Sequence, residues 1–219
     1  MKNKFPLSEI FDSIDGEGKR TGYMVIFVRF AGCNLRCTYC DTAYALKESD
    51  AEEFLSEEEI LERIHSYPWK KITFTGGEPL LQPLSHLCDI LSEEGYEVNI
   101  ETNGAVPLLE KRPKNIFYTM DYKCSGSGMK QFMRISNFKE LRKGDVLKFV
   151  VGDEKDLDEA REIITSWHDG EKPKFYVSPV WGKIQPRKLV EYIRKYEMTD
   201  AAVQLQLHKI IWDPDKRGV

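Results

Sequence analysis

The sequence predicts an α/β fold: a partial, open β/α barrel of about six parallel strands covered by helices, in a single domain over residues 1–219. Short apolar runs alternate along the chain with amphipathic segments of helical period. Strands that alternate with helices pair in parallel, because each connection has to cross a face of the sheet. No internal repeat, low-complexity tract or linker divides the chain.

The predicted strands are short, rich in β-branched or aromatic residues, and often bounded by Gly, Pro or Asp. They cover residues 24–30, 71–75, 97–101, 115–120, 146–151 and 174–178. A seventh, over residues 203–207, is predicted near the C-terminus. In such sheets ligands bind at the carboxyl ends of the strands, so we expect the functional residues there.

Four amphipathic helices are predicted between these strands, over residues 56–66, 84–94, 157–167 and 186–196. Ser56 and Glu59 have the spacing of a capping box, which opens the first of these helices. Gly95 suits the position that ends the second helix, and Pro186 suits the first turn of the fourth.

The composition is that of an ordinary globular protein, with 41% apolar residues and a net charge of −4. This slightly acidic balance gives no electrostatic reason to expect nucleic-acid binding. No apolar run approaches the roughly 20 residues of a membrane span, and residues 1–8 lack a hydrophobic signal core. Three of the five cysteines lie within eight residues, which favours a reducing compartment, so we expect a cytoplasmic protein.

The three clustered cysteines, Cys33, Cys37 and Cys40, follow the first strand with the spacing C-x3-C-x2-C. Three thiolates on one short loop can bind three irons of a [4Fe–4S] cluster and leave the fourth iron open to another ligand. A closed zinc site needs a fourth Cys or His, and none lies near this loop. A zinc site with a remote fourth ligand and chance clustering remain as alternatives. Cys88 lies on an apolar helical face and Cys124 in a Gly/Ser-rich loop, and neither is assigned a role.

The spacing of the cysteines, with the aromatic Tyr39 before the third, resembles the signature of the radical S-adenosylmethionine (SAM) superfamily. The resemblance implies a radical SAM core in which the open iron chelates SAM and an electron from the cluster cleaves it to a 5′-deoxyadenosyl radical. Later segments are similar to the superfamily's SAM-binding motifs, among them residues 75–79 (TGGEP) and 101–104 (ETNG). The SAM-binding residues implied are Tyr39, Gly76, Gly77, Glu78, Glu101, Gly104, Asp121, Lys123 and Ser178.

Within this superfamily the chain resembles the 7-carboxy-7-deazaguanine synthase family over nearly its whole length. The features are the segment SIDGEG at residues 13–18, Arg29 in the first strand, Asp41 and Thr42 after the cysteines, and QLHK at residues 206–209. That family converts 6-carboxy-5,6,7,8-tetrahydropterin to 7-carboxy-7-deazaguanine with loss of ammonia, on the route to queuosine and other 7-deazapurines. It uses Mg²⁺, and SAM is regenerated in each turnover.

The resemblance also implies individual roles. Arg29 suits the substrate carboxylate, because a guanidinium binds a carboxylate through two parallel hydrogen bonds. Thr42 matches the family's Mg²⁺ ligand. The substrate-binding residues implied are Ile14, Asp15, Gly16, Glu17, Arg29, Thr102 and His208. No side chain is assigned a catalytic role, since the cluster and SAM carry the chemistry.

The family further implies a homodimer and a flavodoxin or ferredoxin as electron donor. It offers no role for the tail, residues 210–219. Two rival hypotheses remain: a radical SAM activase that places a glycyl radical on a partner protein, and a non-enzymatic iron–sulfur or zinc module. The segment at residues 16–18, Arg29 and residues 40–42 suit a small carboxylated substrate and so favour the synthase.

Overall fold

The chain forms one nine-stranded sheet, and the computed structural model describes residues 4–168, 171–214 and 216–219. The strand order is β3-β1-β2-β4-β5-β6-β7-β8-β9, with β3 and β9 at the two edges of an open sheet. The strands are β1 Phe5–Ile14, β2 Met24–Phe30, β3 Glu53–Leu55, β4 Lys71–Gly76, β5 Glu97–Thr102, β6 Ile116–Tyr122, β7 Val146–Val151, β8 Lys174–Pro179 and β9 Ala201–Val203. Strands β2 and β4 to β9 are parallel, which confirms the predicted α/β fold.

The N-terminal part of the sheet differs from the prediction. Strand β1 pairs antiparallel with both β2 and β3, and neither β1 nor β3 was predicted. The alternation of apolar and polar residues that would have revealed β1 is broken in two ways. Polar residues interrupt it at Ser8, Glu9 and Asp12, and the register shifts between Leu7 and Glu9.

The C-terminal end of the sheet differs as well. Strand β9 ends at Val203, whereas a strand was predicted over residues 203–207. The chain leaves the sheet at Gln204, whose side chain accepts a hydrogen bond from the Gly18 N–H at 2.7 Å and donates one to the Gly18 carbonyl at 2.9 Å. A polar contact with a distant loop thus ends the strand.

The helices are α1 Glu57–His65, α2 Ser85–Glu93, α3 Glu154–Thr165, α4 Pro186–Lys195 and α5 His208–Ile211. The capping box of α1 is confirmed, because Glu59 N–H donates to Ser56 Oγ at 3.3 Å and Ser56 N–H donates to Glu59 Oε2 at 2.7 Å. Helix α3 begins earlier than predicted, since Asp153 caps it by accepting a hydrogen bond from Asp156 N–H. The single turn of α5 was not predicted.

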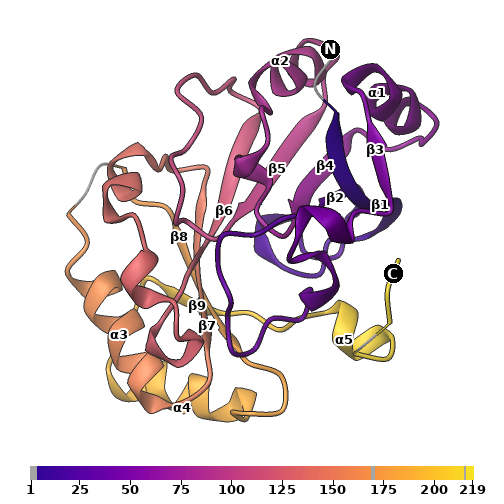
Figure 1. The fold of residues 1–219 in the computed structure, drawn as a ribbon. Helices are drawn as coiled ribbons and strands as arrows, with labels where there is room; N and C mark the ends of the chain where they lie inside the picture. The colour runs from indigo at the N-terminus through magenta and orange to yellow at the C-terminus, as the bar shows by residue number, and fades with distance from the viewer. Residues whose placement is uncertain (1–3, 169–170, 215) are drawn as a thin grey trace.

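The helices pack against the sheet and enclose its core. In Figure 1, α1 and α2 lie beside the half of the sheet that contains β1 to β5, and α3 and α4 lie beside the other half. Fully buried side chains from successive strands form the centre of this core: Leu7, Val28, Phe74, Val98, Met120, Phe149 and Val177. Among the described residues no helix is long and apolar enough to cross a membrane.

The C-terminal segment connects the two ends of the sheet. After β9, at one edge, it runs back to the side of β1 and β2, where α5 lies (Figure 1). Leu207 N–H donates to the Gly16 carbonyl at 3.0 Å, which joins this segment to the loop that follows β1. Residues nearly 200 positions apart therefore meet at the carboxyl end of the parallel strands.

Candidate active site

A cavity of about 420 Å³ lies where these segments meet, within the range of small-molecule sites, about 300–1,000 Å³. Most of the residues predicted from the sequence line it: Ile14, Asp15, Gly16, Glu17, Arg29, Cys33, Cys37, Tyr39, Cys40, Thr42, Gly76, Gly77, Glu101, Thr102, Asp121, Lys123 and His208. Glu78, Gly104 and Ser178 do not line it. The structure thus brings together the predicted cofactor and substrate residues and leaves three of them outside.

The cysteine loop is held in place through its backbone. Gly32 N–H donates to the Ala45 carbonyl at 2.9 Å, Cys33 N–H to the Leu46 carbonyl at 3.0 Å, and Thr38 N–H to the Ser127 carbonyl at 3.0 Å. The three thiols are unpaired and partly exposed to the cavity. Burial raises the pKa of Cys37 and Cys40, so the thiolates that bind iron would form as the metal binds.

This donor set fits a cluster with one open iron. The other two cysteines, Cys88 and Cys124, are fully buried, and neither lines the cavity. The described part of the chain therefore offers the cavity three thiols and no fourth. The remaining space beside the thiols is lined by polar groups that suit a cofactor with both ammonium and carboxylate functions.

The glycines that follow β4 pack directly against the cysteine loop. A Cβ on Gly77 would lie 2.1 Å from the Gly32 carbonyl oxygen, and a Cβ on Gly76 would lie 2.1 Å from the Phe30 carbonyl oxygen. Glu78 N–H donates to the Gly32 carbonyl at 2.8 Å. These contacts show why glycine is needed at both positions even without a ligand: a side chain there would prevent the cysteine loop from lying against the turn.

Glu78 serves as an internal anchor, and its contact with SAM stays a prediction. It is fully buried, and its carboxylate accepts hydrogen bonds from Asn103 N–H at 2.7 Å, Thr102 Oγ1–H at 2.9 Å and Leu80 N–H at 3.0 Å. Burial raises the pKa of Glu78 to about 7 despite these donors. The carboxylate joins the end of β4 to the end of β5 and has little capacity left for a ligand.

Gly104 and Ser178 also lie away from the cavity. A Cβ on Gly104 would meet the side chains of Met133 and Met120, and its φ of +71° lies in the region that favours glycine. Ser178 is fully buried, and its hydroxyl has no hydrogen-bond partner among the described residues. The geometry offers no support for direct contact between SAM and either residue.

Asn103 is a cavity residue that sequence reasoning missed. Its side-chain amide lies 3.7 Å from Cys33 Sγ and donates to Asn34 Oδ1 at 2.9 Å, while its own Oδ1 accepts from Ala105 N–H. An amide so fixed beside a cluster ligand can donate to the sulfur, and such hydrogen bonds tune the cluster potential. The signal was its place in the segment ETNG, from which the resemblance implied roles only for Glu101, Thr102 and Gly104.

Opposite charges lie together at the ends of β5, β6 and β7. Lys123 Nζ lies 2.7 Å from Asp121 Oδ2, and Asp121 Oδ1 is buried without a partner among the described residues. Burial raises the pKa of Glu101 to about 7, and the Glu101 carboxylate accepts a hydrogen bond from Thr75 Oγ1–H at 2.9 Å. Lys148, which sequence reasoning missed, forms an ion pair with Glu17 at 3.1 Å.

The loop over residues 14–17 lies between the sheet and α5. Asp15 is 1% exposed, and its carboxylate accepts hydrogen bonds from Arg20 Nε–H and Thr73 Oγ1–H, each at 3.2 Å. Its side chain is therefore an internal partner of Arg20, although the residue lines the cavity, and its substrate contact stays a prediction. A Cβ on Gly16 would lie 2.1 Å from His208 Nδ1, so the imidazole packs against the Gly16 backbone at the cavity wall.

Arg29 has one nitrogen occupied and two that can bind a ligand. Its Nε donates to Glu9 Oε1 at 2.6 Å, and the same oxygen accepts from Tyr44 Oη–H at 3.0 Å. The two terminal nitrogens make no hydrogen bond or ion pair within the described ranges of the chain. The Glu9 contact leaves the outer edge of the guanidinium free for a carboxylate in the cavity.

Asp41 and Thr42 form a polar group beside the third cysteine. Thr42 Oγ1–H donates to Asp41 Oδ1 at 3.1 Å, and Lys209 Nζ lies 3.0 Å from Asp41 Oδ2. Burial favours a higher pKa for Asp41, but Lys209 outweighs it and lowers the pKa to about 2. The threonine oxygen keeps its lone pairs for a cation, because its proton is directed to Asp41.

The tail forms an outer wall of the cavity through Pro214, Lys216, Arg217, Gly218 and Val219. The Arg217 guanidinium lies 3.5 Å from the centroid of the Tyr44 ring, and the Arg29 guanidinium lies 5.9 Å from the same centroid. The only feature of the sequence that could have indicated this role of the tail is the pair of basic residues Lys216 and Arg217, and such residues are typical of any solvated terminus.

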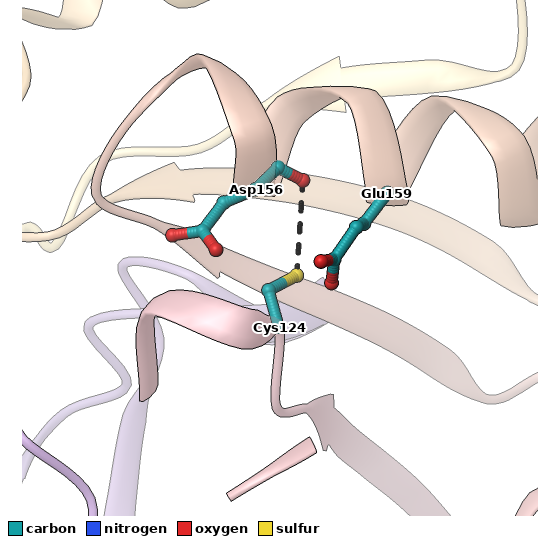
Figure 2. A group of neighbouring side chains, drawn as sticks. All are labelled: Cys124, Asp156 and Glu159. Atoms are coloured by element: carbon teal, nitrogen blue, oxygen red, sulfur yellow. Dashed lines mark hydrogen bonds between the residues drawn. The ribbon is translucent and has the colours of Figure 1, made fainter. Parts of the chain in front are cut away.

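Cys124 lies outside the cavity in a group that resembles a metal site. Figure 2 shows its thiol directed at the first turns of α3, near Asp156 and Glu159. The carboxylates have other partners: Asp156 accepts from the N–H groups of Gly126 and Gly152, each at 2.8 Å, and Glu159 from Ser125 N–H at 3.1 Å. Burial raises the pKa of Cys124, so the group stabilises the loop after β6 rather than presenting a thiolate to a metal.

The chain is similar to known proteins over most of its length. Residues 27–117 match the model of the radical SAM superfamily. The 7-carboxy-7-deazaguanine synthase of Clostridium acetobutylicum is 45% identical over 98% of this chain and 99% of its own length. That of Methanospirillum hungatei is 39% identical over 95% of this chain and 86% of its own length. The crystal structure of QueE from Escherichia coli, 23% identical, shares the fold with a TM-score of 0.75 over 94% of this chain and 95% of that one.

The open sheet and the three-cysteine loop define a radical SAM enzyme, with the [4Fe–4S] cluster and SAM that this class implies. Full-length similarity narrows the class further. The chain belongs to the 7-carboxy-7-deazaguanine synthase family.

Proposed function

We propose that this chain is a radical SAM lyase that converts 6-carboxy-5,6,7,8-tetrahydropterin to 7-carboxy-7-deazaguanine with loss of ammonia. The observation that carries the proposal is a single cavity that joins the three-cysteine loop to Arg29 and the loop at residues 14–17. The synthases from Clostridium acetobutylicum and Methanospirillum hungatei, which this chain resembles over nearly its whole length, support the same activity. The product would enter the biosynthesis of queuosine or other 7-deazapurines.

The cofactors would lie at the inner end of the cavity. Cys33, Cys37 and Cys40 would hold the cluster and leave one iron to SAM. When bound, the cluster and SAM would supply a 5′-deoxyadenosyl radical for hydrogen abstraction from C6 of the pterin. The free oxygen of Asp121 and the nearby backbone of Gly76 and Gly77 can accept hydrogen bonds there.

The substrate would lie between the cysteine loop and α5. The terminal nitrogens of Arg29 would bind its carboxylate, and Glu17 Oε1, which is buried without a partner among the described residues, would accept from a ring N–H group. Burial lowers the pKa of His208, so near neutral pH its imidazole would be uncharged and able to donate or accept one hydrogen bond.

Magnesium would bind at Thr42, with substrate oxygens and water as its other ligands. A hard cation prefers oxygen donors, and the Asp41 carboxylate directs the threonine oxygen by accepting its proton. Lys209 neutralises Asp41 on the other side, which supports a positioning role for that carboxylate rather than direct ligation.

The remaining proposals concern the assembly. We expect a flavodoxin or ferredoxin to supply the electron and a homodimer to be the working form, as in the family that this chain resembles. The continuity of the nine-stranded sheet in the described residues supports a single radical SAM domain over residues 1–219.

The test is an anaerobic assay of the protein reconstituted with iron and sulfide. Carboxypterin, SAM, Mg²⁺ and dithionite are added, and the ultraviolet-absorbing deazaguanine acid is identified by mass spectrometry. We expect product in many-fold excess over enzyme, with little SAM consumed. Cleavage of SAM without any deazapurine would favour a glycyl-radical activase, and bound zinc without SAM cleavage would favour a non-enzymatic module.

A further inference from the structure

Lys148 is a buried lysine on the floor of the cavity with no role in the proposal above. It lies within β7, where all six residues are buried, and it is 7% exposed. A lysine in such a position is almost always paired, because an enclosed ammonium loses its hydration. Its side chain lines the cavity, where a ligand would meet its charge.

The direct partner of Lys148 is Glu17. Lys148 Nζ lies 3.1 Å from Glu17 Oε2, and the two side chains are 8% and 12% exposed. Other charged groups face this pair from the surrounding elements: Asp15 on the loop after β1, Asp41 on the cysteine loop, Glu101 on β5, Asp121 on β6 and His208 on α5. Asp15, Asp41 and Asp121 have their own cations, Arg20, Lys209 and Lys123, so Lys148 is the direct counter-charge of Glu17.

Only one oxygen of Glu17 takes part in this ion pair. The other, Oε1, is enclosed and has no hydrogen-bond partner among the described residues. A buried acceptor left without a donor costs roughly 1–3 kcal/mol, so this oxygen is suited to a donor that arrives with a ligand. Burial favours a neutral Glu17, but Lys148 and His208 outweigh it and lower its pKa below the ordinary value.

We propose that Lys148 is a positioning residue for the substrate: it holds Glu17 as a carboxylate and turns Oε1 toward an N–H group of the pterin ring. The inference rests on the proposed function. A pterin carries several ring and amino N–H groups, and an ionised acceptor binds such a donor more strongly than a neutral one. Without the ammonium, Glu17 would take up a proton or rotate, and the substrate would lose this contact.

The experiment is a double-mutant cycle in the reconstituted holoenzyme, with Lys148→Met, Glu17→Gln and the double variant. We expect K148M to raise the KM for carboxypterin about ten-fold or more, as for a lost charge-assisted hydrogen bond. The reductive cleavage of SAM without substrate should stay within about two-fold of wild type, because the cysteine loop is untouched. In the E17Q background, K148M should raise KM little further, since both changes remove one interaction.

The double variant also separates folding from function, because it removes both buried charges together and leaves neither unpaired. Lys174→Met, at an exposed position on the neighbouring strand β8, is the matched control and should keep the wild-type KM. A wild-type KM in K148M, fully additive effects in the double variant, or an equal loss of SAM cleavage would each overturn the inference. If the wild-type protein makes no deazapurine, the proposed function fails first and the inference fails with it.

Discussion

Burial sets the charge of single carboxyl groups in and beside this cavity. Glu78 and Glu101 both have a pKa raised to about 7, although Glu78 accepts three hydrogen bonds and Glu101 accepts one from Thr75. Removal from water disfavours the ionised form, and these donors compensate only in part. Near neutral pH both carboxyl groups, one in the cavity and one behind it, are therefore partly protonated.

The pH dependence of the unfolding free energy tests whether burial raises the pKa of Glu101. Its folded pKa, about 7, lies above its ordinary value of 4.5, so its contribution to stability is complete at low pH and is lost as the pH rises through about 7. Glu101→Gln removes this titration. As the pH rises through this window, we expect wild type to lose unfolding free energy relative to E101Q, by at most about 1.4 kcal/mol per pH unit. Urea unfolding of metal-free, reduced protein between about pH 4.5 and pH 8 measures it. Parallel pH profiles for the two proteins would contradict the assignment.

Substitution of Arg29 is the second test of a single residue. Its Nε is engaged by Glu9, which leaves two nitrogens for the substrate carboxylate. Arg29→Ala should lower kcat/KM for carboxypterin by about ten-fold or more, because a charge-assisted pair contributes roughly 1.5–3 kcal/mol. Reductive cleavage of SAM should be spared.

Arg63→Ala is the matched control, since that arginine forms an exposed ion pair with Glu53 on the far side of β1. Turnover of carboxypterin and reductive cleavage of SAM without substrate are measured separately for each variant, which distinguishes a loss of substrate binding from a loss of cluster function. Equal losses of turnover and SAM cleavage in R29A would show that the residue supports the cluster instead of the substrate.

At the scale of elements, the site depends on how the turns after the strands pack against one another. The turn after β4 lies against the cysteine loop, and Glu78 joins it to the turn after β5. From there the Asn103 amide returns to Cys33. The segments that resemble SAM-binding motifs thus also hold the cysteine loop in place.

Gly77→Ala tests this packing. The added methyl would lie 2.1 Å from the Gly32 carbonyl and 2.9 Å from the Ala45 carbonyl, and both are backbone atoms that cannot rotate away. We expect the cysteine loop to shift and the iron content after reconstitution to fall well below that of wild type. Gly95→Ala is the control, because its Cβ would meet nothing within 4 Å and its positive φ costs stability only locally, about 1–2 kcal/mol. Full iron loading in G77A would refute the packing argument.

At the scale of the whole molecule, the chain closes its cavity with its own C-terminal segment. After β9 this segment crosses to the β1–β2 side, places His208 and Lys209 at the site and ends along the outer wall (Figure 1). The cavity is therefore complete only when both ends of the sheet are formed.

Removal of residues 214–219 tests this closure. The truncated protein should show a several-fold higher KM for carboxypterin, because the outer wall and Arg217 are lost, while SAM cleavage persists at the inner end. Arg217→Ala is the milder variant and removes only the cation over Tyr44, a contact that contributes about 0.5–2 kcal/mol. Steady-state kinetics on both variants give the comparison, and an unchanged KM in both would exclude a role for the tail.

Much of the architecture follows from local pattern. Six parallel strands, four helices and the placement of motifs at strand ends were predicted, because the hydrophobic period and capping residues are encoded in short stretches. Strand β1 and helix α5 were not, since β1 alternates poorly and α5 is a single turn held by contacts with the rest of the molecule.

The amino-acid sequence by itself determined the chemistry available to this protein: three thiols on one loop, a basic residue beside them, and acids at the ends of parallel strands. Only the tertiary structure decided which of these groups meet. It turned Asp15 and Glu78 into internal partners, brought Lys148 to Glu17 across 131 positions and Asn103 to Cys33 across 70. Local sequence governs backbone conformation through near neighbours, whereas burial and ion pairing depend on segments that become adjacent only when the sheet has formed.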